Sequence, residues 1–214
     1  MTIHLPILGP EELAEVADAL ASIEVSWESL LQTSPEIVLF GSRAAGLAHE
    51  RSDWDILCVG HGCTRRTPRV DLIWVTLEER CSRTWLTGEL AGHVAHWGQW
   101  LEGEPTWTDS AIPGPQACME KLRRITRRVT AWERSWSLCS ARLRARYALA
   151  LRRDLQRHEK LFHGQAVPPS AMLDQNWHEQ SDAGKYLHEL AGRAGVSTDF
   201  VCTEILPIAT RGVG

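Results

Sequence analysis

A long stretch without glycine or proline constrains the fold of this chain more than any other feature. From Gln116 to His163 neither residue occurs, and apolar side chains recur every three or four residues. Such spacing lays an apolar stripe along a helix. One unbroken helix over that span would measure about 70 Å at 1.5 Å per residue, far more than the width of a small domain. We therefore expect two packed helices with a break between Ser135 and Ser140.

The same stretch carries most of the positive charge of the chain. Between residues 121 and 160, thirteen Lys and Arg stand against three acidic residues, although the whole chain has a formal net charge of −4. The remainder is therefore strongly acidic. This asymmetry favours a basic surface that meets an anion, such as an NTP, a nucleic acid or an acidic partner.

Length and composition exclude several classes of protein. The chain has 214 residues, 43% hydrophobic and 23% charged, which is ordinary for one globular domain or two small ones. No segment approaches the roughly 18 apolar residues of a membrane span, and the N-terminus lacks the features of a signal peptide. The six cysteines form no C-x-x-C pair, so neither a zinc ribbon nor a disulfide framework is indicated. We expect a cytoplasmic protein with reduced thiols and no membrane partner.

The N-terminal half alternates helical and strand patterns. Residues 10–24 show helical spacing, and residues 36–40 form a short apolar run that stops at Gly41, as a buried strand does. Two more strands are expected at residues 54–59 and 70–75. Their link is short enough to predict an antiparallel hairpin.

Beyond these strands the pattern becomes mainly helical. Residues 77–101 return to helical spacing, and residues 102–107 are expected to add a strand that Pro105 limits to the edge of a sheet. After a linker at residues 164–170, a further helix is expected at residues 182–194.

The passage most informative about function begins with a turn of small residues. Gly41 and Ser42 follow an expected strand and open a short helical segment, which presents backbone N–H groups and the Ser42 hydroxyl to phosphates. A glycine at position 41 also lets phosphates approach closely. Arg43 is a candidate to clamp a phosphate, although a surface arginine at a helix start is an equal alternative.

Acidic residues follow this turn in a pattern typical of metal sites. Asp53 and Asp55 are two residues apart on an expected strand, so they point to one face while Trp54 points to the other. Asp71 on the neighbouring strand completes the set. Transfer from an NTP needs cations that neutralise the triphosphate, and carboxylate oxygens hold two such cations about 3.5–4 Å apart. Three other acidic residues are substitutes for the third position: Glu78, Glu79 and Asp109.

Taken together, these motifs resemble the signature of the DNA polymerase β-type nucleotidyltransferase superfamily. That signature is Gly-Ser, ten residues, Asp-x-Asp and then a third carboxylate, and here ten residues separate Ser42 from Asp53. The likeness is close in the strings GSRAAG and SDWDILCV and covers about residues 36–76. Within the superfamily, the chain resembles the minimal and the antibiotic nucleotidyltransferases.

The resemblance implies a fold, cofactors and site residues. The fold would be α/β of the α+β type, a small mixed sheet flanked by helices and followed by a helical C-terminal domain. Asp53 and Asp55 would hold two Mg²⁺ ions, with Mn²⁺ as an alternative, and Asp71 would bind one ion and help deprotonate the acceptor. The residues that would contact the NTP are Gly41, Ser42 and Arg43.

We expect two domains and a transfer reaction. Residues 1–112 would form the nucleotidyltransferase catalytic domain and residues 113–214 a helical substrate-binding domain. The reaction would move an NMP, with AMP from ATP favoured, to a hydroxyl of a small molecule, a protein or an RNA. The alternatives are an antitoxin-type enzyme that AMPylates a protein, an RNA 3′-end nucleotidyltransferase, and a catalytically idle nucleotide-binding module.

Three further patterns have simpler structural explanations. His93 and His96 stand three apart on an expected helix, but without a further metal ligand we favour packing or surface exposure. The string from Arg153 to His158 resembles the Arg-x4-6-His motif of the small helical HEPN ribonucleases, yet so short a pattern arises easily by chance in an arginine-rich helix. Three tryptophans have a spacing that favours core packing over a stacking pocket for a base or an acceptor: Trp97, Trp100 and Trp107.

Overall fold

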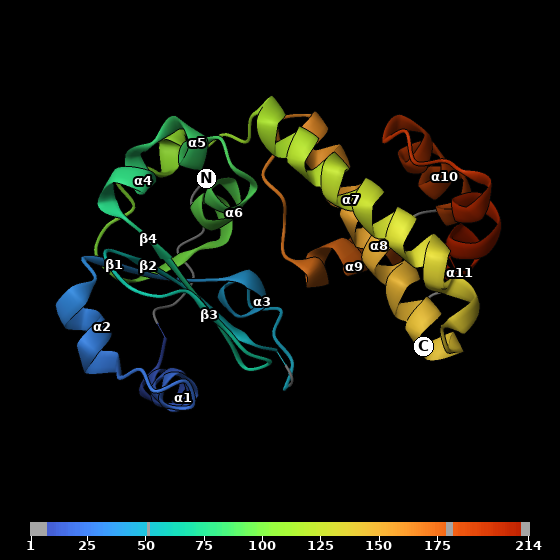
Figure 1. The fold of residues 1–214 in the computed structure, drawn as a ribbon. Helices are drawn as coiled ribbons and strands as arrows, with labels where there is room; N and C mark the ends of the chain where they lie inside the picture. The colour runs from blue at the N-terminus through green and yellow to red at the C-terminus, as the bar shows by residue number, and fades with distance from the viewer. Residues whose placement is uncertain (1–7, 51, 179–181, 211–214) are drawn as a thin grey trace. The chain divides into compact units, whose positions relative to one another are not determined.

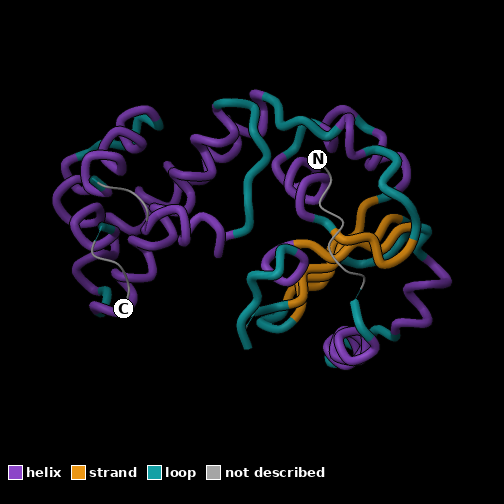
Figure 2. Tube along the Cα trace, turned by 180° about the vertical axis from the view of Figure 1, so that it is seen from behind, coloured by secondary structure: helices purple, strands orange, loops and turns teal. Residues whose placement is uncertain are grey.

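The chain folds into two compact units. The structure, a computed structural model, describes residues 8–50, 52–178 and 182–210. Unit 1 comprises Met1–Pro113 with Pro168–Ala171, and unit 2 comprises Gly114–Val167 with Met172–Gly214. All strands of the described residues belong to unit 1, whereas unit 2 is helical (Figure 1; Figure 2).

Two capped helices open unit 1. In α1 (Pro10–Ala21) the carboxylate of Glu12 accepts a hydrogen bond from the N–H of Gly9, at 2.9 Å, which satisfies one donor at the start of the helix. In α2 (Trp27–Thr33) the hydroxyl of Ser26 accepts from an N–H of the first turn. The helical spacing of residues 10–24 predicted α1. It did not reveal α2, because a helix of two turns is too short to show a clear apolar period.

A five-stranded mixed sheet forms the centre of unit 1. Its strands, in spatial order β3-β4-β2-β1-β5, are β1 (Glu36–Phe40), β2 (Trp54–Val59), β3 (Arg65–Arg66), β4 (Val70–Val75) and β5 (Gln99–Glu102). β1 is antiparallel to both β2 and β5, and β4 is antiparallel to β3 but parallel to β2. The expected strands at residues 36–40, 54–59 and 70–75 are all present, and the α/β fold class is confirmed.

The expected hairpin between β2 and β4 was wrong. These two strands run parallel, with Asp55 of β2 in register with Asp71 of β4. A tight hairpin needs a loop of about two to five residues, whereas residues 60–69 return along the edge of the sheet as β3 before β4 begins. β4 therefore starts at the same end of the sheet as β2.

Apolar side chains cover both faces of this sheet, as strands between two layers require. On one face, here called the Trp54 face, Trp54, Ile56 and Leu72 pack with α1 and α2. On the other, here called the Asp55 face, Leu57, Val59 and Val75 pack with α6 (Glu89–Trp97). Figure 1 shows the sheet between these two layers of helices.

The segment between β4 and unit 2 is more broken than the helical spacing of residues 77–101 predicted. It contains α4 (Leu77–Cys81), α5 (Arg83–Leu86), α6, β5 and the 3₁₀ turn η1 (Thr108–Ser110). Gly98 ends α6 in an extended conformation, and a Cβ there would lie 2.5 Å from the carbonyl oxygen of Val94. The edge strand consequently begins at Gln99, three residues before the predicted range of 102–107, and Pro105 lies beyond its end.

Unit 2 consists of two long helices and several shorter ones. They are α7 (Pro115–Ser135), the 3₁₀ turn η2 (Trp136–Leu138), α8 (Ala141–Phe162), α9 (Ser170–His178), α10 (Ala183–Arg193), the π-helical turn η3 (Val201–Ile205) and α11 (Leu206–Ala209). The predicted break between Ser135 and Ser140 is confirmed, and the hydroxyl of Ser140 caps α8. The helix expected at residues 182–194 is α10. No pattern in the sequence indicated α9.

The apolar stripe of α7 lies in the core of unit 2. Ile125, Val129 and Trp132 are buried there against side chains of α8 and α10. The rings of Trp132 and Tyr147 are stacked with centroids 4.7 Å apart, which joins α7 to α8. The helical stripe read from the sequence is thus the packing face of the helix pair.

Two further expectations concern cysteines and membranes. All six cysteines are free thiols, and burial raises the pKa of the Cys58 thiol to about 12, which keeps it protonated and unreactive. Within the described residues, no helix has both the length and the apolar character of a membrane span.

Candidate active site

The turn between β1 and α3 (Gly41–Ala44) requires a glycine at its first position. Gly41 has a φ of +75°, in the left-handed region that favours glycine. A Cβ on Gly41 would lie 2.0 Å from Oδ2 of Asp55, closer than any contact allows. The main chain of the turn therefore touches the Asp55 carboxylate, a contact that only a glycine permits.

The sheet register brings the acidic residues to this turn. Asp55 of β2 is paired with Phe40, the last residue of β1, on one side and with Asp71 of β4 on the other. Asp53 immediately precedes β2, two residues from Asp55, so the alternation of the strand directs it to the same side. All three carboxylates belong to the Asp55 face, at the end of the sheet where β2 and β4 begin.

Burial and mutual repulsion perturb these carboxylates. The pKa of Asp55 is raised to about 7, first by desolvation and then by the negative charges of Asp53 and Asp71, while Arg66 acts in the opposite direction. The pKa of Asp71 is also raised, mainly by desolvation, against the opposing effect of Arg66. Asp53 and Asp71 thus lie close enough to Asp55 to oppose its ionisation.

A single nearby arginine offsets this negative charge in part. Nε of Arg66 lies 3.1 Å from Oδ1 of Asp71, and the Arg66 side chain is 69% exposed. This ion pair opposes the rise in the pKa of Asp71, whose Oδ1 is otherwise buried. The site therefore keeps an excess of carboxylate charge.

The donor set fits divalent cations by chemical type and charge. Mg²⁺ prefers carboxylate oxygens, and like charges that raise one another's pKa are stabilised by a cation between them. The buried oxygen of Asp71 also lacks a hydrogen bond. In residues 8–50, 52–178 and 182–210, however, no three His, Cys, Asp or Glu side chains converge as a ready-made metal cluster. The fit of this site to a divalent cation consequently rests on the chemical type and the charge of its carboxylates. Their side chains would have to move closer together to bind one ion.

A histidine that sequence reasoning assigned to packing reaches this turn. His93 of α6 accepts a hydrogen bond at Nε2 from the N–H of Gly41, at 3.3 Å. Its ring meets Phe40 edge-on, with centroids 5.9 Å apart, and lies 5.4 Å from Trp97. No spacing in the sequence indicated this contact, because the two residues are distant in the chain and meet only when α6 covers the sheet.

Arg43 has different partners from those expected of a phosphate ligand. Its guanidinium donates to the main-chain carbonyls of Ser52 and Asp53, at 2.9 to 3.2 Å, and stacks over the Trp54 ring at 3.9 Å. Trp54 packs on the face of the sheet opposite the carboxylates. These contacts favour a positioning role for the Arg43 side chain, which holds the segment that leads into β2.

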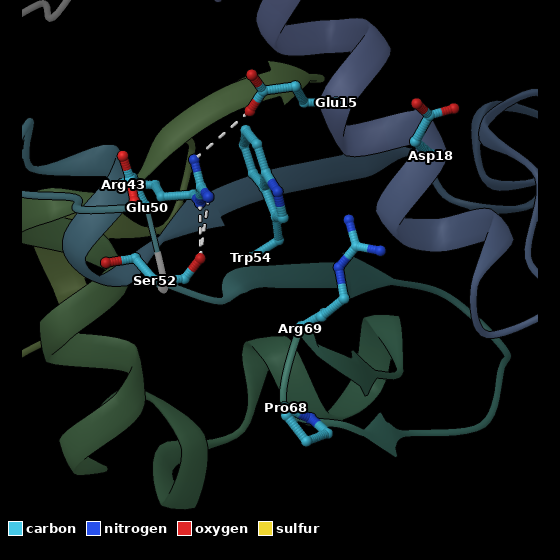
Figure 3. A pocket seen from close by; sticks show the side chains of 8 residues that line it. All are labelled: Glu15, Asp18, Arg43, Glu50, Ser52, Trp54, Pro68 and Arg69. Atoms are coloured by element: carbon cyan, nitrogen blue, oxygen red, sulfur yellow. Dashed lines mark hydrogen bonds and ion pairs between the residues drawn. The ribbon is translucent and has the colours of Figure 1, made fainter.

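A small cavity of about 250 Å³ lies beside Arg43 on the Trp54 face. Figure 3 shows Arg43 between Glu15 of α1 and the main chain at Ser52, with the Trp54 ring alongside. Carboxylates and arginines of opposite charge line it together, including Asp18, Glu50 and Arg69. This mixture of charges gives the cavity no clear preference for an anion or a cation.

The remaining sequence candidates lie elsewhere or have structural roles. Glu78 and Glu79 are in the first turn of α4, beyond the end of β4 opposite Asp71, and Glu79 caps that helix. Trp107 is buried and donates from Nε1 to Glu36, in line with core packing. Trp100 is partly buried beside Trp107, Trp97 is partly buried beside His93, and Asp109 lies in η1.

The residues of the ribonuclease-like string are also part of the packing. Arg153 donates to both carboxylate oxygens of Asp174, and His158 is buried. Desolvation, together with nearby Lys121, lowers the pKa of His158, against the opposing effect of Glu159. These contacts account for both residues as members of the helical core.

Comparison with known proteins points to one superfamily. The family model of the nucleotidyltransferase domain matches residues 21–92. Comparison with curated proteins gave no match. Among solved structures, the chain is similar to one described as the crystal structure of the toxin-antitoxin with AMP-PNP, at 18% identity over 58% of this chain and 93% of the other, with a TM-score of 0.28. So low a score supports no conclusion about substrate or partner.

The matched segment contains the site described above. Residues 21–92 include the whole of β1, β2 and β4, the Gly41 turn and the three carboxylates. The resemblance inferred from the motifs and the family match therefore agree on the same part of the chain. Residues 21–92 therefore match a nucleotidyltransferase domain, in the part of the chain that resembles the DNA polymerase β-type superfamily.

Proposed function

We propose that the chain transfers an NMP from an NTP, with ATP favoured, to a hydroxyl of an acceptor. One observation carries the proposal: the strand register sets Asp55 beside Asp71, and the glycine turn presses on Asp55 from the other side. A phosphate-binding turn and a set of carboxylates are thus joined within one face of one sheet. In this proposal unit 1 is the catalytic domain and unit 2 is the substrate-binding domain.

Each residue of the turn has a separate task in the reaction. Gly41 lets the main chain of the turn lie against the Asp55 carboxylate, and Ser42 offers its hydroxyl, which makes no hydrogen bond within the described residues. Arg43 holds the carbonyls of Ser52 and Asp53, which sets where β2 begins. His93 keeps the N–H of Gly41 directed toward α6.

The carboxylates supply charge and accept a proton. Asp53, Asp55 and Asp71 would hold Mg²⁺ or Mn²⁺, which would neutralise the triphosphate and the charge that develops on it. The acceptor oxygen forms a bond to the α-phosphorus as the bond to the β-phosphate bridging oxygen breaks, and pyrophosphate leaves. Asp71, whose pKa is raised, takes the proton of the acceptor hydroxyl.

The acceptor belongs to one of three classes: a small molecule, a protein or an RNA. A small-molecule acceptor would make the chain an antibiotic-modifying type of enzyme, and a protein acceptor an antitoxin type that AMPylates its partner. An RNA acceptor would make it a 3′-end nucleotidyltransferase. A catalytically idle module has less support, because all three carboxylates are present on one face of the sheet.

A labelling experiment tests this proposal and separates the classes. The protein is incubated with each α-labelled NTP, Mg²⁺ and cell extract, and label is then followed into small molecules, protein and RNA. We expect label from ATP in one of the three fractions, its loss with Asp55→Asn and its retention with Glu78→Gln, an acid outside the site. Equal labelling by the wild type and Asp55→Asn would place the reaction elsewhere in the extract or the chain.

A further inference from the structure

Positive charge exceeds negative charge in the buried ion pairs of unit 2. Asp154 of α8 is 2% exposed and pairs with three cations at once. Lys121 of α7 approaches it at 3.5 Å, Arg128 of α7 at 2.5 Å and Arg157 of α8 at 3.9 Å. One carboxylate is thus shared by three cations from two helices.

A second carboxylate nearby is shared in the same way. Asp174 of α9 pairs with Arg152, at 2.9 Å, and with Arg153. These arginines lower the pKa of Asp174, although desolvation acts in the opposite direction. The two carboxylates together hold five cations in place.

The cations that reach the surface follow one flank of α8. Arg142, Arg146, Arg153 and Arg157 are separated by four, seven and four residues, which places them in a row about 22 Å long on one side of a helix. The side chains of Arg153 and Arg157 are 33% and 28% exposed. Arg142 and Arg146 are exposed, and neither has an ion pair within the part of the chain that the structure describes.

The neighbouring flank of α7 extends this row. Arg128 meets Arg157 at Asp154, and its side chain is 46% exposed. Arg124 lies one turn earlier on the same flank of α7 and is exposed. The α7–α8 arginine face is therefore composed of Arg124, Arg128, Arg142, Arg146, Arg153 and Arg157.

The chemistry of this face selects a polyanion with regularly spaced charges. Arginine forks bind phosphate through two hydrogen bonds, and residues four or seven apart in a helix present them about 6 and 10 Å apart. Protein interfaces instead centre on apolar anchors. On α8 the exposed large hydrophobic residue is Phe162, at the end of the helix beyond the row, and Leu138 lies before the helix begins, in η2. A backbone of phosphodiesters fits this arrangement better than a protein surface does.

We infer that the α7–α8 arginine face binds the phosphodiester backbone of a nucleic acid. Asp154 and Asp174 act beneath the surface as positioning residues, since they hold the guanidinium groups in place before a phosphate arrives. The face lies wholly within unit 2. The inference is thus independent of the proposed transfer reaction, and a nucleic acid bound here can be an acceptor or a separate ligand.

Two charge-matched variants test the inference. The first replaces three cations of the face by glutamine: Arg124→Gln, Arg142→Gln and Arg146→Gln. The second removes the same charge from another flank of α7, through Arg123→Gln, Arg127→Gln and Arg134→Gln, which are exposed and have no ion pair among the described residues. Binding of labelled 20-nucleotide RNA, and of DNA of the same sequence, is measured by fluorescence anisotropy between 50 and 300 mM salt, without NTP or Mg²⁺.

We expect the first variant to bind at least about tenfold more weakly than the wild type, and the second to bind like the wild type. The slope of log affinity against log salt should become less steep by about 2, since each phosphate contact with a single strand contributes about 0.7. Tighter binding of one of the two strands would show whether the face prefers RNA or DNA. Circular dichroism melting confirms that both variants are folded.

Three results would overturn the inference. Equal losses in the two variants would show general charge attraction, and a wild type that fails to bind either strand at 150 mM salt would show a solvated face. Polyglutamate that binds as tightly as RNA would point to an acidic protein partner. None of these results bears on the transfer reaction, which the labelling experiment tests through Asp55 in unit 1.

Discussion

The two units of this chain are unbalanced in charge in opposite directions. In unit 1, three carboxylates on one face of a sheet share one nearby arginine, and the pKa of Asp55 rises to about 7. In unit 2, two carboxylates each serve two or three cations, and Asp154 is buried beneath Lys121, Arg128 and Arg157.

This comparison separates acidic residues that weaken the fold from acidic residues that hold it together. Removal of an acid from unit 1 relieves repulsion, so those acids stand there at the expense of stability. Removal of an acid from unit 2 leaves buried cations unpaired, so those acids hold the fold. A carboxylate that destabilises its own fold indicates a ligand, whereas one that stabilises it is explained by the fold alone.

The largest expected effect is on turnover in unit 1. Asp53→Asn or Asp55→Asn should reduce nucleotidyl transfer at least about 100-fold, because a cation in such a site contributes several kcal/mol to the transition state. The melting temperature should stay the same or rise, since each change removes a like charge. Glu78→Gln, with its carboxylate outside the site, is the control. A variant that melts much lower and keeps its activity would reverse the assignment.

The next effect should be the opposite one in unit 2. Asp154→Asn should lower the free energy of unfolding by about 3–5 kcal/mol, because Lys121 is 1% exposed and loses its charged partner. Glu133→Gln, an exposed acid on α7 without an ion pair in the described residues, is the matched control. Denaturant unfolding measures both. If the two variants lose equal stability, Asp154 is not holding the helices together.

A smaller effect should separate two glycines of the same loop. Gly41 and Gly46 have similar positive φ angles, +75° and +68°, so alanine at either position costs about 1 kcal/mol of backbone strain. Only at Gly41 would the new Cβ collide with Asp55; at Gly46 nothing lies within 4 Å. We expect Gly41→Ala to weaken NTP binding by about tenfold or more relative to Gly46→Ala. Calorimetric titration with a non-hydrolysable NTP measures it, and equal affinities would remove the turn from the site.

The last effect concerns pH. The pKa of Asp55 is about 7 in the folded chain and 3.8 without its environment, so the folded state holds a proton that the unfolded state releases in this interval. The associated stability is complete below about pH 4 and is lost as the pH rises through 7. From pH 5 to 8 the wild type should therefore lose more stability than Asp55→Asn. Parallel pH dependences of the two melting temperatures would contradict the raised pKa.

The common face of the two carboxylates could be predicted from the sequence because it depends only on local geometry. Asp53 and Asp55 are two residues apart, and a strand period of two decides their common face without any knowledge of the fold. The pairing of Asp55 with Asp71 could not be predicted from the sequence, because it depends on β3 returning the chain to the end of the sheet where β2 begins. In the antiparallel hairpin that the short link suggested, Asp71 would have paired near Val59, at the far end of β2.

The contacts of Arg43 and His93 were beyond sequence reasoning for a similar reason. Arg43 follows the motif directly, yet its guanidinium turns to the Trp54 face and binds carbonyl oxygens there. His93 reaches Gly41 only because α6 packs across the Asp55 face. Both sets of contacts depend on which layer of helices covers which face of the sheet. The periodicity of the sequence does not indicate that arrangement.

Local spacing and backbone freedom were sufficient to predict the strands at residues 36–40, 54–59 and 70–75, the glycine turn, the paired acids and the broken helical half. The tertiary structure alone decided that β4 runs parallel to β2, that His93 reaches the turn, and that Asp154 gathers cations from two helices. These features join residues far apart in the chain. Their energies come from packing and charge at contacts that exist only after the layers have assembled, so local patterns carry no record of them.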